Sequence, residues 1–459
     1  MYLRQLHIRN LKLLKDFHLS FANERGEPRM WTVIIGENGT GKTSILQAIA
    51  MAAAGALNVN SLIDNVSSLR DKRAPRSDVI VEAEFALDAR YRHLRSYPGF
   101  PGGKPQGEVR IDSSVVLSAG KKNLVARSFY ESVEGGHLQG LKDVHGREVD
   151  PLDEARSTDA QLWFVAAYGI QRFLPRNINQ KQQELNRPSV DRLRPVFQPV
   201  PLIGTGFANL LAGRKATAYS NVLRKALFSV EGLLPNFDGL EMRGRGGVRS
   251  AQDLQERHRF VQVLPSGRLK LAANWLSHGY QSTIAWIADL VGQILWEAKS
   301  TLDPEDMEGL VLIDELDLYL HPRWQRTLIQ TLKQTFPRLQ FVVTTHSPLA
   351  LVGLRPDQDE IVRLHINERT GDITSLDMKR GRAHEPDPRL MTGSELYQSY
   401  FGIERFYPDR LGDLLREHRY LAADPGRDRR AEERLDAIEA ELRREGVEPD
   451  FPREPRSRR

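Results

Sequence analysis

Hydrophobic and polar positions alternate in two stretches of the chain, 1–22 and 79–87, and this period of two predicts β-strands. Uninterrupted apolar runs of strand length are typical of strands buried on both faces of a parallel sheet, and they occur at 31–35, 162–167, 310–313 and 339–344. Helical patterning predicts helices at 43–56, 216–234, 281–299, 322–335 and 391–445. Strands and helices that alternate in this way indicate an α/β fold.

A glycine-rich turn follows the run 31–35 and opens the helix 43–56. Residues 36–43 read GENGTGKT, which fits the phosphate-binding pattern G-x-x-x-x-G-K-[ST]. Glycines let backbone N–H groups surround a β-phosphate, and the helix N-terminus adds its positive end. We therefore expect ATP with Mg²⁺ here, rather than an unrelated glycine turn. The expected ATP contacts are Gly36, Asn38, Gly39, Gly41, Lys42, Thr43 and Ser44, with the Thr43 hydroxyl also on Mg²⁺.

Two acids, Asp314 and Glu315, end the apolar run 310–313. A carboxylate pair at the tip of a buried strand is costly to desolvate unless it has a partner. We expect Asp314 to hold Mg²⁺ through water, and Glu315 to polarise the attacking water as a general base. The alternative is a strand end with two solvated acids, which the phosphate-binding turn upstream argues against.

Two further segments accompany these acids. Residues 276–282 read LSHGYQS and precede a helix, so Ser277 and the backbone at Gly279 are candidates for a γ-phosphate contact. An ordinary N-capped helix would look the same when taken alone. The run 339–344 ends in TTHSP, and we expect His346 to lie beside the γ-phosphate rather than to serve a structural role.

Together these motifs resemble the ABC-type ATPase heads of the SMC/RecF/OLD group, and in particular the AAA-like ATPases of bacterial anti-phage systems and RecF-type repair proteins. The resemblance rests on DE-x-x-x-x-LHP at 314–322, TTHSP at 344–348 and LS-x-G-x-Q-S at 276–282. It covers 1–90 and 260–405. It implies a P-loop NTPase of the ABC-ATPase type, with a mixed sheet, flanking helices, an inserted lobe and a helical C-terminal region.

The resemblance also implies that ATP lies between two heads arranged head to tail, so a homodimer or higher homo-oligomer is expected. Each site would join the P-loop of one copy to Ser277 of the other. His321 stands where transporters have an Asp, which leaves its role open. Residues 168–172 resemble a YG-x-x-R element, and Gln171 is the candidate Q-loop contact to ATP and Mg²⁺. Arg172 as a phosphate contact, and an ordinary turn, are the alternatives.

On this basis the chain divides into five parts. The first half of the ATPase head is 1–90, and the second half, with the signature segment LSHGYQS at 276–282, Asp314, Glu315 and His346, is 260–390. Between them lies an inserted lobe at 91–259, which starts in a segment rich in proline and glycine. A helical region at 391–445 and a disordered tail at 446–459 complete the expectation.

Composition narrows the partners. The chain of 459 residues has no cysteine and no apolar run of about 18 residues, so we expect a cytoplasmic protein without disulfides or a membrane partner. Its net charge is only +5, but 172–225 holds ten Lys or Arg against two acids. That stretch could contact DNA phosphates, or it could be a solvated basic loop.

Together with the motifs, the resemblance implies an ATPase that acts as a switch or motor on DNA or on a partner effector, in anti-phage defence or DNA repair. The alternative is a scaffold or sensor with little turnover that assembles a separate nuclease. A transporter subunit is disfavoured, because about 240 residues separate Gly36 from Ser277. A nuclease within this chain is not expected either, because the segment after Phe401 is short and shows no acidic metal cluster.

Overall fold

The computed structural model of the chain describes residues 1–88, 108–132, 136–138, 150–153, 164–172, 188–199, 202, 214–230, 233–241, 243, 256–298, 302–375, 387–403, 409–449 and 451–454. The chain folds as two compact units, Met1–Gly393 and Ser394–Arg459. None of the helices in the described ranges is long and apolar enough to span a membrane.

An antiparallel sheet begins the first unit, with strands in the order β2-β1-β4-β5-β6-β7. Its strands are β1 Tyr2–Leu11, β2 Leu14–Ser20, β4 Val79–Asp88, β5 Glu108–Leu117, β6 Val125–Ser132 and β7 Gly136–Leu138. The alternation of the sequence sets the two faces of this sheet. Leu6 and Ile8 of β1 point to the buried face, whereas Gln5 of the same strand points to the other face and is exposed.

A second sheet carries the predicted chemistry, in the order β15-β14-β3-β13-β12-β8. Its strands are β3 Trp31–Gly36, β8 Val165–Tyr168, β12 Gly309–Ile313, β13 Leu339–Thr344, β14 Glu360–Ile366 and β15 Ile373–Ser375. The neighbours β8, β12, β13, β3 and β14 pair in parallel, and β15 pairs antiparallel to β14. Because parallel strands end at the same edge, the segments after β3, β12 and β13 meet there.

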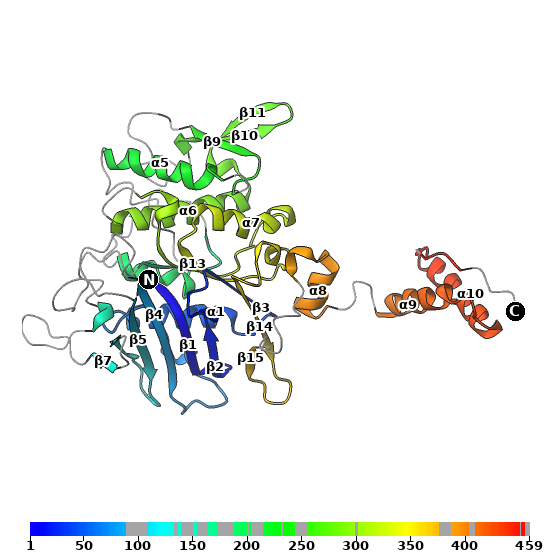
Figure 1. The fold of residues 1–459 in the computed structure, drawn as a ribbon, viewed down its shortest axis with the longest axis horizontal. Helices are drawn as coiled ribbons and strands as arrows, with labels where there is room; N and C mark the ends of the chain where they lie inside the picture. The colour runs from blue at the N-terminus through cyan, green and yellow to red at the C-terminus, as the bar shows by residue number, and fades with distance from the viewer. Residues whose placement is uncertain are drawn as a thin grey trace, which may run out of the picture. The chain divides into compact units, whose positions relative to one another are not determined.

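Helix α1, Lys42–Ala52, lies between these two sheets (Figure 1). Its apolar side chains, including Ile45 and Ile49, belong to one core with residues of both sheets. Packing on both sides explains why α1 is buried along nearly its whole length, and it holds the preceding glycine-rich turn against the strand ends.

Helices α5, Arg214–Phe228, and α6, His278–Ala298, lie one above the other on the opposite side of the second sheet (Figure 1). The Tyr219 hydroxyl joins them by donating to the Ala288 carbonyl at 2.9 Å. Helix α7, Pro322–Thr335, follows β12, and α3, Pro188–Asp191, is a single turn. A small antiparallel sheet completes this side, with β9 Phe237–Glu241, β10 Arg259–Leu264 and β11 Gly267–Leu271.

The expectation of one inserted lobe at 91–259 is wrong for the described part of that stretch. Strands β5 and β6 extend the first sheet by pairing with β4, and β8 pairs with β12 in the second sheet. Strand β9 pairs with β10, which belongs almost entirely to the predicted second half of the head at 260–390. Backbone pairing between distant segments, which a linear division of the chain does not capture, distributes this region over three sheets.

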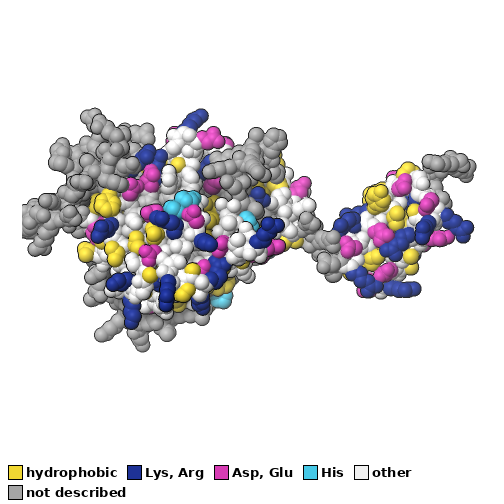
Figure 2. Space-filling view, turned by 90° about the horizontal axis from the view of Figure 1, so that it is seen from below, with side chains coloured by type: hydrophobic (Ala, Val, Ile, Leu, Met, Phe, Trp, Pro, Cys, Tyr) yellow, Lys and Arg dark blue, Asp and Glu magenta, His cyan; other side chains and the backbone are white. Residues whose placement is uncertain are grey.

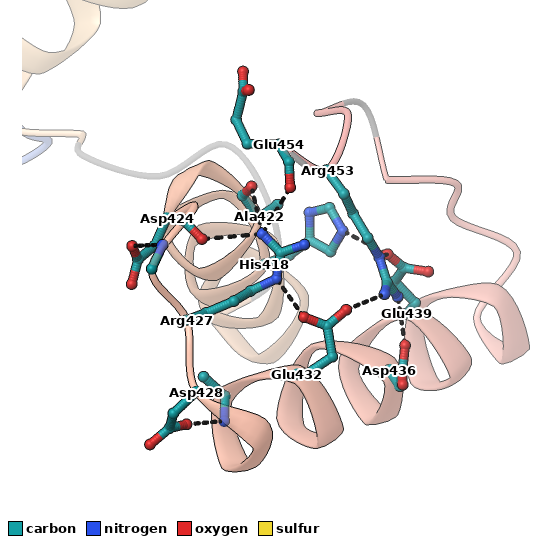
Figure 3. A network of polar contacts seen from close by, with 12 residues as sticks. His418, Ala422, Asp424, Arg427, Asp428, Glu432, Asp436, Glu439, Arg453 and Glu454 are labelled. Atoms are coloured by element: carbon teal, nitrogen blue, oxygen red, sulfur yellow. Dashed lines mark hydrogen bonds and ion pairs between the residues drawn. The ribbon is translucent and has the colours of Figure 1, made fainter. Parts of the chain in front are cut away.

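The second unit begins one residue into α8, Gly393–Phe401, and also holds the packed helix pair α9, Asp409–Ala423, and α10, Arg429–Arg444 (Figure 1). Leu414, Leu415, Ile438 and Leu442 form its small core. Charged side chains join the helices around this core, and Arg427 and Glu432 form one of the ion pairs (Figure 3).

We expected disorder from residue 446, but 451–454 lie against α10. The Arg453 guanidinium donates to Glu439 and to Asp436, each at 2.6 Å (Figure 3). The Glu454 carbonyl accepts from Arg427 at 2.9 Å. A tail rich in arginine can therefore be held by the acidic face of a helix even where it has little apolar surface to bury.

Candidate nucleotide-binding site

The turn between β3 and α1 has a backbone that only glycine adopts readily. Gly41 precedes α1 with φ 79°, and Gly36 has φ 155°. A Cβ on Gly36 would lie 2.7 Å from the Leu364 carbonyl oxygen, so β14 leaves no room for a side chain. The first N–H groups of a helix lack intrahelical acceptors, which makes this end of α1 suitable for a phosphate.

The Lys42 ammonium lies across this turn. It donates to the carbonyl oxygens of Gly36 and Glu37, both at 2.8 Å. Burial lowers the pKa of Lys42, and the carboxylates of Asp314 and Glu315 offset part of that effect. A phosphate beside this desolvated ammonium would stabilise its charge, so Lys42 is placed for the anion contact that the sequence predicts.

Asp314 and Thr43 meet at the end of β12. The Thr43 hydroxyl donates to Asp314 Oδ2 at 2.8 Å, and the Thr344 hydroxyl of β13 donates to Asp314 Oδ1 at 2.7 Å. Asp314 is only 6% exposed. Mg²⁺ prefers hard oxygen ligands such as hydroxyls and carboxylates, so the Thr43–Asp314 pair fits a magnesium ion between the P-loop and this strand end.

Glu315 has a strained backbone that its neighbours hold in place. Its φ of 50° lies in the left-handed region, which costs a non-glycine residue about 1–2 kcal/mol. The Arg172 guanidinium donates to the carbonyl oxygens of Asp314 and Glu315 at 2.6 and 2.7 Å. The Glu315 N–H donates to Thr344 Oγ1 at 2.7 Å. Strain that the surroundings enforce in this way is typical of functional sites.

A cavity of about 410 Å³ lies between the glycine-rich turn and these strand ends, a size suited to a small-molecule ligand. It brings together most of the predicted site residues. The lining residues are Lys12, Leu13, Leu14, Asn38, Gly39, Gly41, Lys42, Thr43, Ser44, Asp314, Glu315, His346 and Ile373. His346 is exposed and follows β13, in the position that the TTHSP segment predicts.

Lys12 is a cavity residue that the sequence reasoning missed. It lies in the turn between β1 and β2 and donates to Ser44 Oγ at 3.0 Å and to Gln47 Oε1 at 3.2 Å. Burial lowers its pKa. No motif marks this lysine, and only the packing of the β1–β2 turn against α1 brings a second ammonium to the P-loop.

Ser277 and Gly279 lie at the start of α6 and do not line the cavity of their own chain. Ser277 is exposed, whereas Gly279 is buried against the segment after β12: a Cβ there would lie 2.6 Å from the Tyr319 carbonyl oxygen. Two large side chains nearby are open to solvent, Trp275 at 76% and Tyr319 at 51% exposure. The signature is therefore a surface with exposed aromatic side chains.

Gln171 follows β8 and is exposed, and it does not line the cavity, so its contact to ATP and Mg²⁺ stays a prediction. Arg172 is not placed as a phosphate contact. It is 2% exposed, and its guanidinium is taken up by the carbonyls behind Asp314 and Glu315. Burial lowers the pKa of Arg172 to about 10, which leaves it charged at neutral pH.

Several cations of the basic stretch 172–225 have internal partners. Besides Arg172, the Arg192 guanidinium is buried and donates to the Val165 carbonyl at 2.7 Å. Lys225 pairs with Asp303 at 2.6 Å. Arg176, Lys181 and Arg187 lie outside the described residues. The count of cations in this stretch therefore overstates the charge that it offers to a nucleic acid.

The P-loop between β3 and α1, facing the acids at the end of β12, defines an α/β fold of the P-loop NTPase class. Two domain families match it in separate segments. Residues 1–94 match "AAA ATPase domain", and residues 171–352 match "AAA domain, putative AbiEii toxin, Type IV TA system". The likeness to AAA-like ATP-binding proteins that the motifs indicate is thereby confirmed.

Curated relatives extend this likeness over most of the chain. The chain is 26% identical over 445 residues to the Septu protein PtuA of Bacillus mycoides (strain KBAB4), and the match covers 96% of this chain and 50% of that protein. It is 25% identical over 397 residues to the Retron Ec83 probable ATPase of Escherichia coli, covering 75% of this chain and 68% of the relative. The chain thus spans half the length of the PtuA relative.

Solved structures with a similar chain path include heads of SMC proteins. The SMC head bound to the C-winged helix domain of ScpA has a TM-score of 0.48 at 15% identity and covers 83% of this chain and 100% of its own. The SMC head domain from Thermotoga maritima has a TM-score of 0.41 at 15% identity and covers 82% and 100%.

Proposed function

We propose that the chain binds MgATP in the cavity beside α1 and hydrolyses it. The observation that carries this proposal is the pair Thr43 Oγ1–Asp314 Oδ2 at 2.8 Å, with Glu315 held next to it on the same cavity wall. Lys42 and the N-terminus of α1 bind the phosphates, and Thr43 with Asp314 hold Mg²⁺, which neutralises phosphate charge when bound. Glu315 orients and deprotonates the attacking water, and His346 contacts the γ-phosphate.

Steady-state phosphate release tests these roles. Lys42→Ala removes the phosphate contact and is expected to raise the Kd for ATP strongly. Glu315→Gln keeps ATP binding but is expected to lower kcat by about 10²–10⁴-fold, as for the loss of a general base. Lys15→Ala is the matched control, because Lys15 is 69% exposed and lies outside the cavity. Wild-type rates in the Lys42 and Glu315 variants would refute the proposal.

We further propose that two copies assemble head to tail on ATP, so that Ser277 and Gly279 of one copy complete the cavity of the other. Two observations support this: neither residue lines the cavity of its own chain, and Trp275 and Tyr319 expose aromatic surface beside the signature. The mass of Glu315→Gln protein should double with MgATP. A mass that stays monomeric at saturating ATP would contradict this assembly.

We infer that this ATPase serves as a switch in anti-phage defence and acts on DNA or on a separate effector protein, such as a nuclease. The similarity to a Septu protein and to retron ATPases supports the setting. The buried arginines of the stretch 172–225 favour a protein effector over DNA. The test is the ATPase rate with double-stranded, single-stranded and no DNA at two salt concentrations: a stimulation that salt weakens would favour DNA.

The second candidate is an ATP-dependent scaffold with little turnover. The contact of Thr43 with Asp314 supports it as well as it supports hydrolysis, because a site that binds MgATP serves assembly even when the water is not activated. Turnover per dimer separates the two candidates. A rate far below one per minute, with or without DNA and effector, would support the scaffold over the switch that depends on hydrolysis.

A further inference from the structure

A second group of chemically active side chains lies on the outer face of the first sheet. His7 of β1 stands opposite His18 of β2 in the antiparallel register. Asp16 lies two residues before His18, so strand alternation puts all three side chains on the same face. The other face of β1 and β2 is buried in the core, and none of the three lines the nucleotide cavity.

Both imidazoles turn a nitrogen toward one carboxylate oxygen. His7 Nε2 lies 2.7 Å from Asp16 Oδ1, and His18 Nε2 lies 3.4 Å from the same oxygen. The two rings stack with centroids 3.6 Å apart and planes inclined by 19°. One potential ligand atom from each residue lies within 4.8 Å of the others. A metal at about 2.0–2.2 Å from each ligand needs the ligand atoms about 3–3.5 Å apart, so binding must lengthen the His7–Asp16 contact and tilt the two stacked rings until their nitrogens converge.

A second carboxylate supports His7 from the other side of its ring. His7 Nδ1 lies 3.3 Å from Glu82 Oε2, an oxygen that Arg9 holds at 3.2 Å. Histidines that bind metals usually present their second nitrogen to a carboxylate, which keeps the proton there and leaves the other nitrogen free to coordinate. In the structure His7 Nε2–H donates to Asp16, and a metal that displaces this proton would meet the Nε2 lone pair while Glu82 keeps the proton on Nδ1.

The group is open to an ion from solvent. The side chains of Asp16 and His18 are 69% and 66% exposed, and His7 is 25% exposed. They border a hollow of about 960 Å³ whose lining includes Glu82, Glu84, Asp112 and Glu360. Figure 2 shows histidine side chains next to acidic ones on the face seen from below.

The charge around Asp16 also leaves room for a cation. Arginines pair with several acids of the hollow, for example Arg4 with Glu84 at 3.1 Å and Arg29 with Glu360 at 3.1 Å. Within the described ranges, no lysine or arginine forms an ion pair with Asp16, whose partners are the two histidines. The carboxylate is therefore available to a metal that the imidazoles bind at the same time.

We propose that His7, Asp16 and His18 bind one divalent transition-metal ion, such as Zn²⁺, through two imidazole nitrogens and one carboxylate oxygen. Imidazole and carboxylate together suit Zn²⁺, Ni²⁺ or Co²⁺ rather than Mg²⁺ or Ca²⁺, which take oxygen ligands. Glu82 positions His7, and water fills the remaining coordination site. The ion joins β1 to β2 across the sheet.

The test is a titration of the untagged, metal-stripped protein with Zn²⁺ by calorimetry and with Co²⁺ by visible absorption, in excess Mg²⁺ to occupy Asp314. The expected result is one Zn²⁺ per chain on this site with a micromolar or lower Kd. His18→Ala and Asp16→Asn should each raise this Kd at least tenfold, and Glu82→Gln should raise it about 10–100-fold. His365→Ala is the control histidine, because it does not line the hollow.

The variants keep the test decisive. Asp16 and His18 are exposed, so their replacement should leave ATP binding unchanged, which checks the fold. A Zn²⁺ Kd in His18→Ala within twofold of wild type would overturn the proposal. A wild-type Kd in the millimolar range would do the same, and would leave a surface group held by hydrogen bonds alone.

Discussion

Arg172 offers the sharpest test of how the site is built, because it touches only the backbone of the two acids. Its guanidinium donates to the carbonyl oxygens of Asp314 and Glu315 at 2.6 and 2.7 Å and is buried with them. Glu315 has a left-handed backbone at φ 50°. We predict that Arg172→Met releases this turn and displaces the Glu315 carboxylate, although Arg172 itself does not line the nucleotide cavity.

The magnitude follows from the bonds that are lost. A hydrogen bond to a charged group contributes about 1.5–3 kcal/mol, so two such bonds hold the turn by about 3–6 kcal/mol. That exceeds the cost of about 1–2 kcal/mol for the left-handed backbone of Glu315, so without Arg172 the turn can relax. Loss of an aligned general base lowers kcat by about 10²–10⁴-fold. The KM for ATP should change little, because Arg172 does not line the cavity.

The assay is the split between kcat and KM in steady-state phosphate release. Arg172→Lys keeps the positive charge but loses one of the two aligned donors. This variant should therefore fold and have a kcat between those of wild type and Arg172→Met. Arg192→Met is the matched control. Arg192 is similarly buried, but it donates to the Val165 carbonyl and to Glu297, and not to Asp314 or Glu315. Arg192→Met should lower stability without a selective loss of kcat.

The reasoning would be refuted by folded Arg172 variants that hydrolyse ATP at the wild-type rate. It would also fail if KM rose as much as kcat fell, since that pattern would make Arg172 a nucleotide contact. An equal loss of kcat in Arg192→Met would show that general destabilisation, and not the position of Glu315, causes the effect.

Three further predictions follow from single contacts. Thr344→Val removes the hydroxyl that orients Asp314 and should lower kcat about 10–100-fold while raising the Mg²⁺ concentration needed for half-maximal rate, at a stability cost of about 1–3 kcal/mol. Lys12→Ala removes the second ammonium of the cavity and should raise the Kd for ATP about 5–50-fold, measured by calorimetry. Arg453→Ala should speed amide exchange in α10, because the hydrogen bond from Arg453 to the ionised Glu439 stabilises that helix, and the same bond lowers the pKa of Glu439. That difference from wild type should shrink as the pH falls below about 4.3, where Glu439 becomes protonated in the unfolded and then the folded state.

Each of these predictions has its own control. Thr345→Val removes a neighbouring hydroxyl that contacts Asp317 and not Asp314, so an equal Mg²⁺ shift there would contradict the role of Thr344. Lys15→Ala should leave the Kd for ATP unchanged. If it raised the Kd as much as Lys12→Ala does, the loss of one positive charge from the protein, and not the position of Lys12, would explain the effect. Arg429→Ala removes an exposed ion pair with Glu433 on α10. If amide exchange in α10 were equally fast in Arg429→Ala and Arg453→Ala, the Arg453 contacts would not be what stabilises this helix.

The sequence alone predicts the part of the site that local pattern defines. The run 31–35, the GENGTGKT turn and the acids after 310–313 each depend on a few consecutive residues, and parallel pairing brings their ends together. His346 is placed by the same rule, because it follows a strand next to β3. The structure brings these residues to one cavity, as the sequence predicts.

The contacts that the sequence does not show depend on tertiary packing. Lys12 reaches the cavity through a turn between strands of the other sheet, and Arg172 comes from the end of the edge strand β8. The sequence does not reveal that the stretch 91–259 is shared among sheets, because antiparallel additions to an existing sheet leave no mark of their partner in the sequence. Its count of cations misled for a related reason: burial and ion pairing of arginine are tertiary properties.

The central claim is that each ATP site takes its P-loop from one copy and Ser277 from another. The most direct measurement is phosphate release from a mixture of Lys42→Ala and Ser277→Arg proteins, each of which should be inactive alone. In a head-to-tail dimer with two-fold symmetry, about half of the dimers in an equal mixture contain one copy of each variant, and each of these keeps one intact site of two, so the mixture should recover roughly a quarter of the wild-type rate. A mixture as inactive as its two components would contradict the shared site.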